Sequence, residues 1–300
     1  MSAQGQDPDA LGVVIRERRR LLAIAYRLLG TVAEAEDAVQ EAYVRWYQLG
    51  EGERSAIDNV PAWLTRVTSN ICLDVLKSAR RRREQYVGPW LPEPLPSDSA
   101  GSTDPADRVT LDESVSTALL LVLESMTPAE RVAFVLHDVF KVPFPEVAEI
   151  VGRTPAAVRQ LATSARRRVD TTRARRSSSD VHASVVRAFA AACEKGDLRA
   201  LLAVLDPTVE LRSDGGGIVR AAYRPVVGAT KAARFLLGVL AKRPEWRLEL
   251  RTVPEGLAVV LLDDAPGRGA VESVITVQVI DGRIHDIWMM RNPLKLSRWA

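Results

Sequence analysis

The chain has 300 residues, of which 47% are hydrophobic and 26% are charged, and its formal net charge is +3. This length exceeds one ordinary helical domain and favours two or three domains, each with enough apolar residues for a core. No apolar run is long enough to cross a bilayer, and the first residues lack the basic-then-apolar pattern of a signal peptide. We therefore expect a cytoplasmic protein that does not contact a membrane.

Positive charge is concentrated in two short segments. Residues 1–180 carry 24 Lys+Arg against 25 Asp+Glu, and residues 181–300 carry 17 against 13. Between Arg153 and Arg176, however, there are eight Arg and one Asp, and five Lys+Arg lie between Lys77 and Arg83. Local patches determine the field that a phosphate backbone meets, so both segments are candidates for binding nucleic acid.

The first predicted helices lie between Leu21 and Trp46. Apolar residues from Leu21 to Leu29 predict a helix that Gly30 ends, and Thr31 with Glu34 predicts a capping box for the next. One face of this second helix is apolar and consists of Ala35, Ala38, Val39, Ala42, Tyr43 and Trp46. Another face is polar and consists of Asp37, Gln40, Glu41 and Arg45. Such a polar face is either solvated surface or a docking face for another protein.

A further helix is predicted from Val60 to Glu84. Its core side is predicted to hold Leu64, Val67, Ile71 and Val75. A second side brings together Asn70, Asp74, Lys77 and Arg81 at helical spacing. An amide, a carboxylate and cations on one face could read unpaired bases and hold phosphate, although a charged helix face is usually just exposed.

Proline and glycine then become frequent from Gly88 to Asp107, which predicts a linker without regular structure. Within it Trp90 and Leu91 are apolar, and an exposed Trp is unfavourable, so we expect another part of the chain to cover it. Beyond the linker, a helix is predicted from Leu111 to Ser125. Thr127 to Glu130 forms a second capping box, and the residues predicted to point inward after it are Val132, Val135, Leu136 and Val139.

Two helices joined by a tight turn follow. The first has Pro145 near its start and Gly152 as its left-handed end; the second has Thr154 as its cap and Pro155 in its first turn. The apolar stripe of the second helix is Val158, Leu161, Ala165 and Val169, and its other side carries Arg159, Gln160, Thr163, Ser164 and Arg166 to Arg168. This pattern predicts a DNA-binding helix-turn-helix, closed by a flexible hinge from Arg173 to Asp180.

The periodicity changes after Val181. Residues 181–205 predict two helices, and Thr230–Lys242 predicts a third. Strand alternation is found in Val209–Arg212, Trp246–Val253, Val271–Ile280 and Ile284–Met290, with a hairpin turn at Asp281-Gly282. These elements predict an α+β domain whose curved antiparallel sheet wraps around a helix.

This order of parts resembles a sigma-70 family sigma factor of the extracytoplasmic-function (ECF) type with a C-terminal SnoaL-like (NTF2-like) extension, over about residues 10–298. The resemblance implies two all-α sigma domains, the second a helix-turn-helix, followed by the α+β domain. Region 2 would span residues 10–86, the Pro-rich linker 87–110, region 4 residues 111–176 and the extension 181–298. The function implied is to direct core RNA polymerase to specific promoters and initiate transcription, without enzymatic activity.

The resemblance also assigns partners and contacts. The segment AEDAVQEAYVRW matches the part of the family that grips the β′ clamp helices of core RNA polymerase, which assigns Asp37, Gln40, Glu41 and Arg45 to polymerase binding; region 4 would meet the β flap. Contacts to the −10 element of promoter DNA are assigned to Asn70, Asp74, Lys77, Arg80, Arg81 and Arg82. Contacts to the −35 element are assigned to Thr154, Arg159, Gln160, Ser164, Arg166 and Arg167.

Three short motifs are typical of the subgroup with this extension: WLPEP in the linker, DGGG from Asp214 and NPLKL from Asn292. Where the family usually has Lys and an acidic residue, this chain has Ile218 and Leu294. The resemblance implies that the extension folds back through these motifs and tunes activity in place of a separate anti-sigma protein. The residues implied in this interdomain contact are Trp90, Leu91, Pro92, Asp214, Gly215, Gly216, Gly217, Asn292 and Pro293.

Other functions stay open at this point. A stand-alone helix-turn-helix regulator with a ligand-sensing domain would have no use for the polymerase-binding helix. An enzyme of the SnoaL type would need an acid or base in its pocket, for which Asp214 and His285 are candidates. A small-molecule ligand of the C-terminal domain is also left open. Cys72 and Cys193 are predicted to be buried thiols, and since His137 and His182 lack metal-ligand spacing, we expect no metal and no cofactor.

Overall fold

The computed structural model describes residues 8–83, 86–97, 115–174, 177–263 and 270–299, and these divide into two compact units. The helical unit comprises residues 8–81 and 122–169. The sheet unit comprises the other described residues, so it includes the described part of the linker. None of the described helices is long and apolar enough to cross a membrane.

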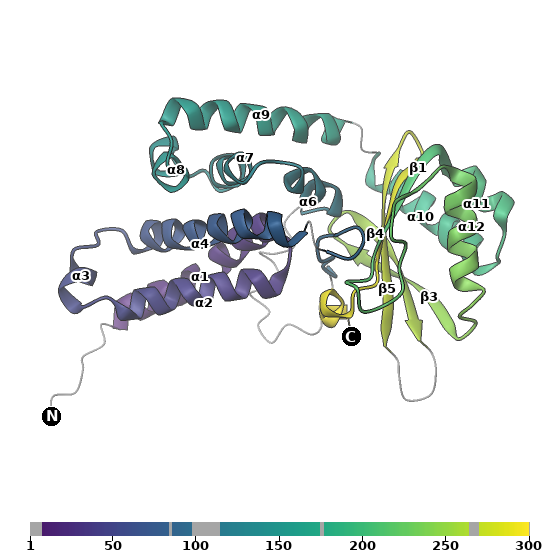
Figure 1. The fold of residues 1–300 in the computed structure, drawn as a ribbon, viewed down its shortest axis with the longest axis horizontal. Helices are drawn as coiled ribbons and strands as arrows, with labels where there is room; N and C mark the ends of the chain where they lie inside the picture. The colour runs from purple at the N-terminus through teal and green to yellow at the C-terminus, as the bar shows by residue number, and fades with distance from the viewer. Residues whose placement is uncertain (1–7, 84–85, 98–114, 175–176, 264–269, 300) are drawn as a thin grey trace. The chain divides into compact units, whose positions relative to one another are not determined.

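The first part of the helical unit contains α1 (Pro8–Leu29), α2 (Val32–Gln48), α3 (Glu51–Ser55) and α4 (Val60–Arg83) (Figure 1). Gly30 has a φ of 84°, which lets the chain turn sharply between α1 and α2. Thr31 caps α2 as predicted, because its Oγ1 accepts a hydrogen bond from the N–H of Glu34 at 3.4 Å. The second hydrogen bond differs from that of a capping box, in which the Glu34 carboxylate would accept from the backbone N–H of Thr31. Here the Glu34 carboxylate accepts from the Thr31 hydroxyl at 2.8 Å.

The buried face of α4 differs from the predicted one. Val67, Ile71 and Val75 are only half-buried, whereas Leu64, Thr68, Ser69, Cys72, Leu73 and Leu76 are buried. Apolarity alone placed the buried face next to its actual position, because the small side chains of Thr68 and Ser69 are fully covered despite their hydroxyl groups. The prediction for Leu64 is confirmed, and Cys72 is a buried free thiol, as expected.

The second part, residues 122–169, contains the end of α6 (Thr117–Glu124), α7 (Pro128–Ala133), the π-helical turn η1 (Phe134–Val139), α8 (Phe144–Val151) and most of α9 (Pro155–Ala174). Within the described residues, the helix predicted from Leu111 to Ser125 corresponds to α6, and Leu111 itself lies outside the described residues. The capping box at Thr127 is confirmed. Val139 was wrongly predicted to point inward and is 38% exposed. The π turn, closed by the bond from Phe140 N to Val135 O at 3.1 Å, adds a residue and rotates Val139 away from the core.

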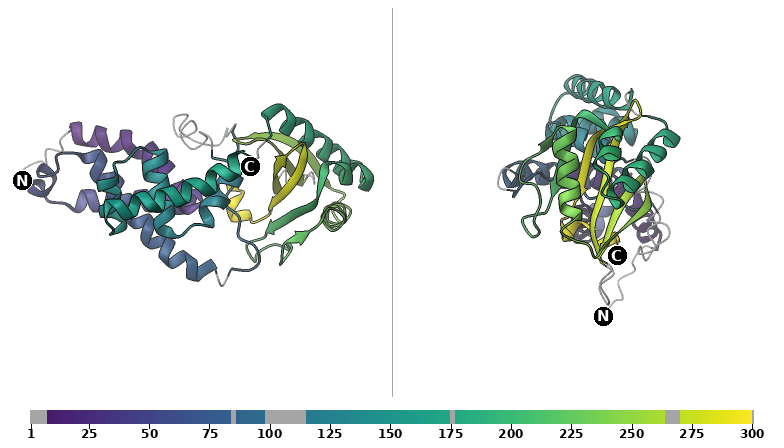
Figure 2. Two further views of the ribbon diagram at one scale, coloured as in Figure 1. Left: turned by 90° about the horizontal axis from the view of Figure 1, so that it is seen from above. Right: turned by 90° about the vertical axis from the view of Figure 1, so that its right-hand side faces the viewer.

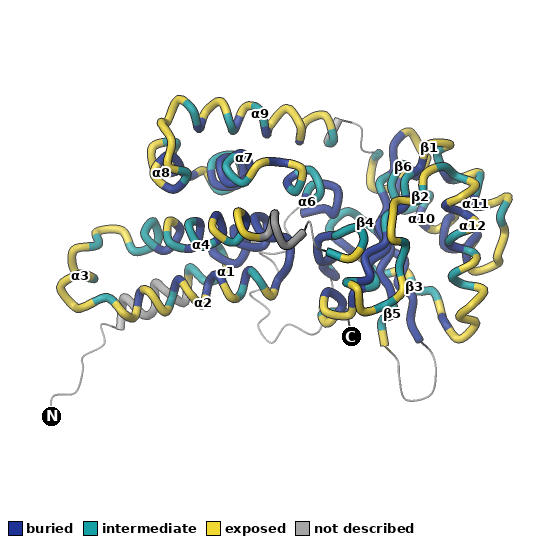
Figure 3. The backbone as a smooth tube through the Cα atoms, in the orientation of Figure 1, coloured by how far each residue is buried: buried dark blue, intermediate teal, exposed yellow. Residues whose placement is uncertain are grey.

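The helix-turn-helix is confirmed in its local geometry. Gly152 ends α8 with a φ of 67°, and Thr154 Oγ1 accepts a hydrogen bond from Ala157 N at 3.2 Å at the start of α9. The buried stripe of α9 consists of Val158, Ala162, Ala165 and Val169, with Leu161 half-buried beside it. The other side of α9 is exposed, as Figure 3 shows.

The sheet unit begins with α10 (Ser179–Glu194) and α11 (Leu198–Val204), and α12 (Ala229–Leu240) lies between strands. Its strands are β1 (Leu205–Asp214), β2 (Val226–Val227), β3 (Trp246–Val253), β4 (Gly256–Asp263), β5 (Val271–Ile280) and β6 (Arg283–Met290), followed by the short turns η2 (Pro293–Lys295) and η3 (Ser297–Trp299). The strand order is β2-β1-β6-β5-β4-β3. The α+β fold class is confirmed, with one difference: β1 and β6 run parallel, so the sheet is mixed.

Two segments differ from their predictions. β4 was not predicted, because its sequence GLAVVLLD is a continuous apolar run without alternation. The predicted hinge from Arg173 to Asp180 overlaps the ends of two helices: α9 runs to Ala174 and α10 starts at Ser179. Between them, Ser177 N donates to Val279 O at 3.1 Å, while Arg175 and Arg176 lie outside the described residues.

Both faces of the sheet are covered, which explains the apolar strands. On the inner face, α10, α11 and α12 cover the sheet (Figure 2). The buried cluster of this layer includes Phe189, Leu236 and Ile287. On the outer face, a second cluster is formed by residues distant in sequence, including Leu91 of the linker, Ala118 of α6, Trp288, Leu296 and Trp299. The linker and the C-terminal residues therefore belong to the core of the sheet unit.

Candidate nucleic-acid interface and interdomain site

The polar face of α2 is exposed, as predicted. Asp37, Gln40, Glu41 and Arg45 are all exposed, and Glu41 Oε1 lies 2.8 Å from Arg45 Nε. The sequence analysis missed two apolar neighbours on the outside of α2, Val44 and Tyr47, which are 48% and 46% exposed. Val44 follows Gln40 by four residues and Tyr47 follows Val44 by three, and this helical spacing was the signal that could have revealed them.

On α4, the predicted −10 residues form a mixed face. Asn70 is half-buried, whereas Asp74 and Lys77 are exposed and form an ion pair at 3.1 Å. The helix continues through Arg80, Arg81 and Arg82, but their side chains lie outside the described residues.

On α9, the predicted −35 residues divide into two groups. Thr154, Arg159, Gln160, Arg166 and Arg167 are exposed, and Arg159 lies 5.4 Å over the ring of Phe144. By contrast, Ser164 is half-buried and donates a hydrogen bond to Glu130 at 2.9 Å. Arg166 also has a partner within the unit, since its Nε donates to Asp138 Oδ1 at 2.8 Å.

A groove of about 680 Å³ connects the two candidate DNA-binding helices. Leu73 and Lys77 of α4 line it together with Gln160, Leu161 and Ser164 of α9. The two parts of the helical unit are also joined by Arg131, which is 4% exposed and donates to Leu28 O at 2.8 Å and Glu124 at 2.7 Å. Burial lowers the pKa of Arg131 to about 10, which leaves the guanidinium charged at neutral pH.

In the sheet unit, the three short motifs meet around a buried ion pair. Asp214 is fully buried and Lys295 is 6% exposed, and Lys295 Nζ lies 2.8 Å from Asp214 Oδ2. The backbone of Leu91 takes part at both ends: its N–H donates to Asp214 Oδ2 at 2.9 Å, and its carbonyl accepts from Lys295 at 2.6 Å. The linker is therefore held by a carboxylate and an ammonium group that are both removed from water.

Further contacts complete this linker-binding site of the sheet unit. Tyr86 donates to Asp214 Oδ1 at 2.7 Å and accepts from Asn292 Nδ2 at 3.1 Å. Burial, followed by the hydrogen bond and charge of Asp214, raises the pKa of the Tyr86 phenol. Gly216 N donates to Asp214 Oδ1 at 2.9 Å, and a Cβ at Gly216 would collide with Asn292. Tyr86 was not predicted, because it precedes the WLPEP motif and shows no spacing signal.

The other motif residues support this arrangement. Lys295 Nζ lies 4.3 Å from the ring centre of the half-buried Trp90, a cation–π geometry. Gly217 packs against Val87, and a Cβ at Gly215 would overlap the carbonyl of Val219. Pro92 is buried in the linker and Pro293 opens η2. The expectation that another part of the chain covers Trp90 and Leu91 is thus confirmed.

The two candidate catalytic residues are not brought together. Asp214 pairs with Met290 in the sheet register, whereas His285 lies five residues earlier on β6, roughly 16 Å along the strand. His285 Nε2 instead lies 3.4 Å from Asp206 Oδ2. Among the described residues, no three His, Cys, Asp or Glu side chains cluster as metal ligands would.

Comparison with known proteins identifies the family. The model of Sigma-70 region 2 matches residues 13–82, and the model of Sigma-70 region 4 matches residues 116–169. ECF RNA polymerase sigma factor SigJ of Mycobacterium tuberculosis is 40% identical over 288 residues, which cover 93% of this chain and 91% of SigJ. The chain belongs to the ECF RNA polymerase sigma factors.

Two more comparisons extend over most of this sigma factor. The crystal structure of SigJ matches with a TM-score of 0.73 and 35% identity, over 96% of this chain and 98% of that one. Probable ECF sigma factor SigI of M. tuberculosis is 44% identical over 224 residues, 73% of each chain. The sequence-based identification is confirmed, and the protein directs RNA polymerase to promoters to initiate transcription. The alternative of a helix-turn-helix regulator that is not a sigma factor is thereby set aside.

Proposed function

We propose that this sigma factor binds core RNA polymerase through the exposed face of α2. The observation that carries the proposal is the contrast between the two sides of this helix: Ala35, Val39 and Trp46 are buried, while Asp37, Gln40, Glu41 and Arg45 are exposed. The neighbouring Val44 and Tyr47 add apolar area to a charged surface, a combination typical of protein interfaces. Its partner is the pair of β′ clamp helices, and region 4 meets the β flap.

Charge reversal tests this assignment. In the variant Asp37→Lys with Glu41→Lys, two acidic side chains at the proposed contact become basic. Co-purification with core polymerase should be lost, because the new charges no longer complement the surface of the β′ clamp helices. The matched control is Asp180→Lys with Glu194→Lys, which makes the same change of charge on exposed positions of α10. Unchanged binding of the α2 variant, or equal loss in the control, would refute the assignment.

We propose that α4 and α9 bind the two promoter elements. Asn70, Asp74, Lys77 and the arginines Arg80 to Arg82 capture unpaired bases and phosphates of the −10 element, and Thr154, Arg159, Gln160, Ser164, Arg166 and Arg167 contact the −35 element. Because Ser164 and Arg166 already have partners in Glu130 and Asp138, Arg159 and Gln160 are the first candidates for base contacts. Arg159→Ala should weaken binding to the −35 element by about 1–3 kcal/mol, measured by footprinting with the polymerase holoenzyme.

We propose further that the sheet unit regulates the sigma factor by holding the linker. The buried pair Asp214–Lys295 binds both backbone groups of Leu91, and Trp299 Nε1 donates to Pro94 O at 2.8 Å. Residues 10–86 would act as region 2, 87–110 as the linker, 111–176 as region 4 and 181–298 as the regulatory extension. Holding residues 86–97 limits how freely the chain between the two DNA-binding regions can move.

Run-off transcription with core polymerase tests the regulatory role. Lys295→Met removes the ammonium group that holds Leu91, and we expect promoter-specific transcription to change by about fivefold or more, the usual range of allosteric coupling. Lys242→Met, at an exposed position of the same unit, serves as control and should leave transcription unchanged. If Lys295→Met and a chain ending at Ser178 both transcribe like the intact protein, the extension does not regulate.

We propose that the extension has no catalytic activity and that the protein works in the cytoplasm with the polymerase. The burial of Asp214 supports the first point, since four hydrogen-bond donors surround its carboxylate and leave no access for a substrate.

A further inference from the structure

The two edges of the sheet differ in length. At one edge β2 has only two residues, whereas at the other edge β3 has eight. β3 pairs with β4 in unbroken register along its whole length, so no bulge turns it away from a neighbour. An edge strand presents N–H and C=O groups that can pair with a further strand, and natural proteins usually shorten or distort such edges. β2 follows this rule and β3 does not.

Alternate residues of β3 direct their backbone groups away from β4. Thr252 O accepts a hydrogen bond from Ser97 N at 2.9 Å, and Trp246 N donates to a carbonyl of the preceding turn at 3.0 Å, so both bond outside the β3–β4 ladder. This direction alternates along an antiparallel strand, and therefore Leu248 and Leu250 also point their N–H and C=O groups outward. Within the part of the chain that the structure describes, these outward groups of Leu248 and Leu250 meet no backbone partner.

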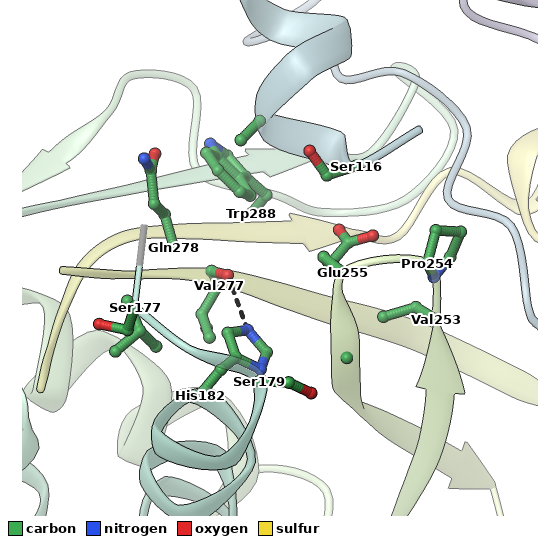
Figure 4. Close-up of a pocket in the computed structure, with 13 residues that line it drawn as sticks. Ser116, Ser177, Ser179, His182, Val253, Pro254, Glu255, Val277, Gln278 and Trp288 are labelled. Carbon is green, nitrogen blue, oxygen red and sulfur yellow. Dashed lines mark hydrogen bonds between the residues drawn. The ribbon is translucent and has the colours of Figure 1, made fainter. Parts of the chain in front are cut away.

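The C-terminal end of β3 is already occupied. Its turn at Pro254 and Glu255 lines a cavity of about 310 Å³ together with Ser116, just before α6, and His182, in the first turn of α10 (Figure 4). The linker holds the last outward carbonyl of the strand, as described above. A further strand can therefore add to β3 over Trp246–Leu250 and not beyond it.

The side chains of this open stretch are self-complementary. On the outer face, Arg247 and Glu249 carry opposite charges, lie 2.7 Å apart and are 53% and 30% exposed. On the inner face, Leu250 is 40% exposed and Leu248 is half-buried. Charges on an edge usually oppose pairing. Here residues of opposite sign flank Leu248, so a two-fold axis at Leu248 sets each charge against its opposite.

This axis defines one register for a second copy of β3 that runs antiparallel to the first. With Leu248 opposite Leu248, the outward N–H of each donates to the carbonyl of the other. Arg247 then lies opposite Glu249 of the second copy, and Glu249 lies opposite its Arg247. The exposed Leu250 comes to lie beside Trp246 of the second copy, so apolar surface is covered as well.

Other registers are less favourable. An axis at Glu249 would set the two Glu249 carboxylates directly against each other and would leave both oppositely charged pairs unformed. An axis at Leu250 would need the Thr252 carbonyl, which already accepts from Ser97. The charge pattern and the open stretch therefore favour the same register.

We propose that β3 is a dimerisation surface that pairs with β3 of a second copy of this chain, antiparallel and with Leu248 on the two-fold axis. The sheets of the two copies then form one continuous sheet, with inner face beside inner face. Because the paired stretch is short, the dimer is reversible and has a Kd of about 1–100 μM.

Sedimentation equilibrium of the full-length protein at about 1–200 μM should show this reversible dimer. Arg247→Glu sets an acidic group against Glu249 of the second copy and should weaken association about tenfold or more. Arg247→Glu combined with Glu249→Arg exchanges the two charges and should restore association. Arg199→Glu, which makes the same change of charge at an exposed position of α11, is the matched control and should dimerise like the wild type.

Amide hydrogen exchange, followed by mass spectrometry with single-residue resolution, locates the pairing. The N–H groups of Leu248 and Leu250 should exchange rapidly at about 1 μM and become protected at about 200 μM. The N–H of Glu249 bonds within the β3–β4 ladder and should be protected at both concentrations. Protection of Leu248 and Leu250 at both concentrations would mean that another part of the same chain lies on the edge, and would overturn the proposal.

Three further results would also overturn it: a protein that stays monomeric up to about 200 μM, a charge exchange that fails to restore association, or an equal loss in the Arg199→Glu control. None of these measurements involves polymerase or DNA. Their failure would therefore leave the proposed polymerase and promoter contacts untouched, and loss of polymerase binding would leave the proposed dimer standing.

Discussion

At the scale of single residues, the contact between Asp214 and Lys295 is the most consequential in the sheet unit. Both side chains are buried, so each would be strongly unfavourable alone. The carboxylate is satisfied by Tyr86, Leu91, Gly216 and Lys295, and the ammonium group by Asp214 and Leu91. The two charges thus add to the apolar contacts of Leu91 in holding the linker on the sheet unit.

Lys295→Met should lower the free energy of unfolding of the sheet unit by about 3 kcal/mol, because it leaves the Asp214 carboxylate buried without its counter-charge. Urea denaturation measures the change. The double variant Asp214→Asn with Lys295→Met should recover part of this loss, since no buried charge remains. Lys242→Met should change stability by less than about 0.5 kcal/mol. A single variant as stable as the control would mean that the pair contributes nothing.

Tyr86 predicts a pH dependence. Its pKa is raised in the folded protein, first by burial and then by Asp214, so the folded state keeps the phenol proton at pH values where the unfolded chain has released it. The raised pKa of Tyr86 therefore stabilises the folded protein fully at pH values below the unfolded pKa of about 10. This stabilisation is lost as the pH rises above that value towards the folded pKa. The urea midpoint of the wild type should fall more steeply above about pH 10 than that of Tyr86→Phe. Parallel pH profiles would contradict the raised pKa.

At the scale of elements, the turn between α8 and α9 sets the direction of the candidate recognition helix. Gly152 has a φ of 67° and ends α8, and Thr154 caps α9 two residues later. A glycine is needed here for its backbone conformation alone, because a Cβ at Gly152 would meet no atom within 4 Å.

Gly152→Ala should therefore destabilise the helical unit by about 1 kcal/mol. The whole cost is conformational, because a residue with a Cβ is strained in the left-handed backbone conformation. Gly152→Asn should cost less, because Asn tolerates this conformation better. Thermal unfolding followed by circular dichroism measures both. If Asn is as unfavourable as Ala, crowding and not backbone conformation determines the residue at this position.

At the scale of the whole molecule, the two units alternate along the chain. Residues 8–81 and 122–169 form the helical unit, whereas 86–97 and 115–121 between them belong to the sheet unit. The C-terminal domain is therefore built partly from the segment that connects the two DNA-binding regions. We expect removal of the domain to expose Leu91 and Leu95, which are 1% and 7% exposed in the intact chain.

A chain ending at Ser178 should show this in its fluorescence. It keeps Trp46, Trp63 and Trp90, and Trp90 loses the ammonium group of Lys295 that covers its ring. Quenching of Trp90 by acrylamide, taken as the difference from Trp90→Phe, should rise relative to the full-length protein. The same difference for Trp63→Phe should stay constant, because Trp63 lies in α4 of the helical unit, which the shorter chain keeps. Constant quenching at Trp90 would mean that the domain does not cover the linker.

The sequence by itself determined the elements with strong local signals and the family. The caps at Thr31, Thr127 and Thr154, the end at Gly152 and the Asp281-Gly282 turn are properties of a few adjacent residues, so they can be recognised without the fold. The motifs around Trp90, Asp214 and Asn292 were recognised as strings of residues. They indicated that the linker is covered, although not through which atoms.

Only the tertiary structure decided which surfaces are buried and which side chains pair. The core face of α4, the rotation of Val139 by the π turn and the parallel pairing of β1 with β6 depend on neighbours far away in the sequence. The same holds for Tyr86 at Asp214 and for the open edge at β3, which follows from the strand order. Local periodicity reports how apolar a face is, whereas the packing of distant segments determines what that face meets.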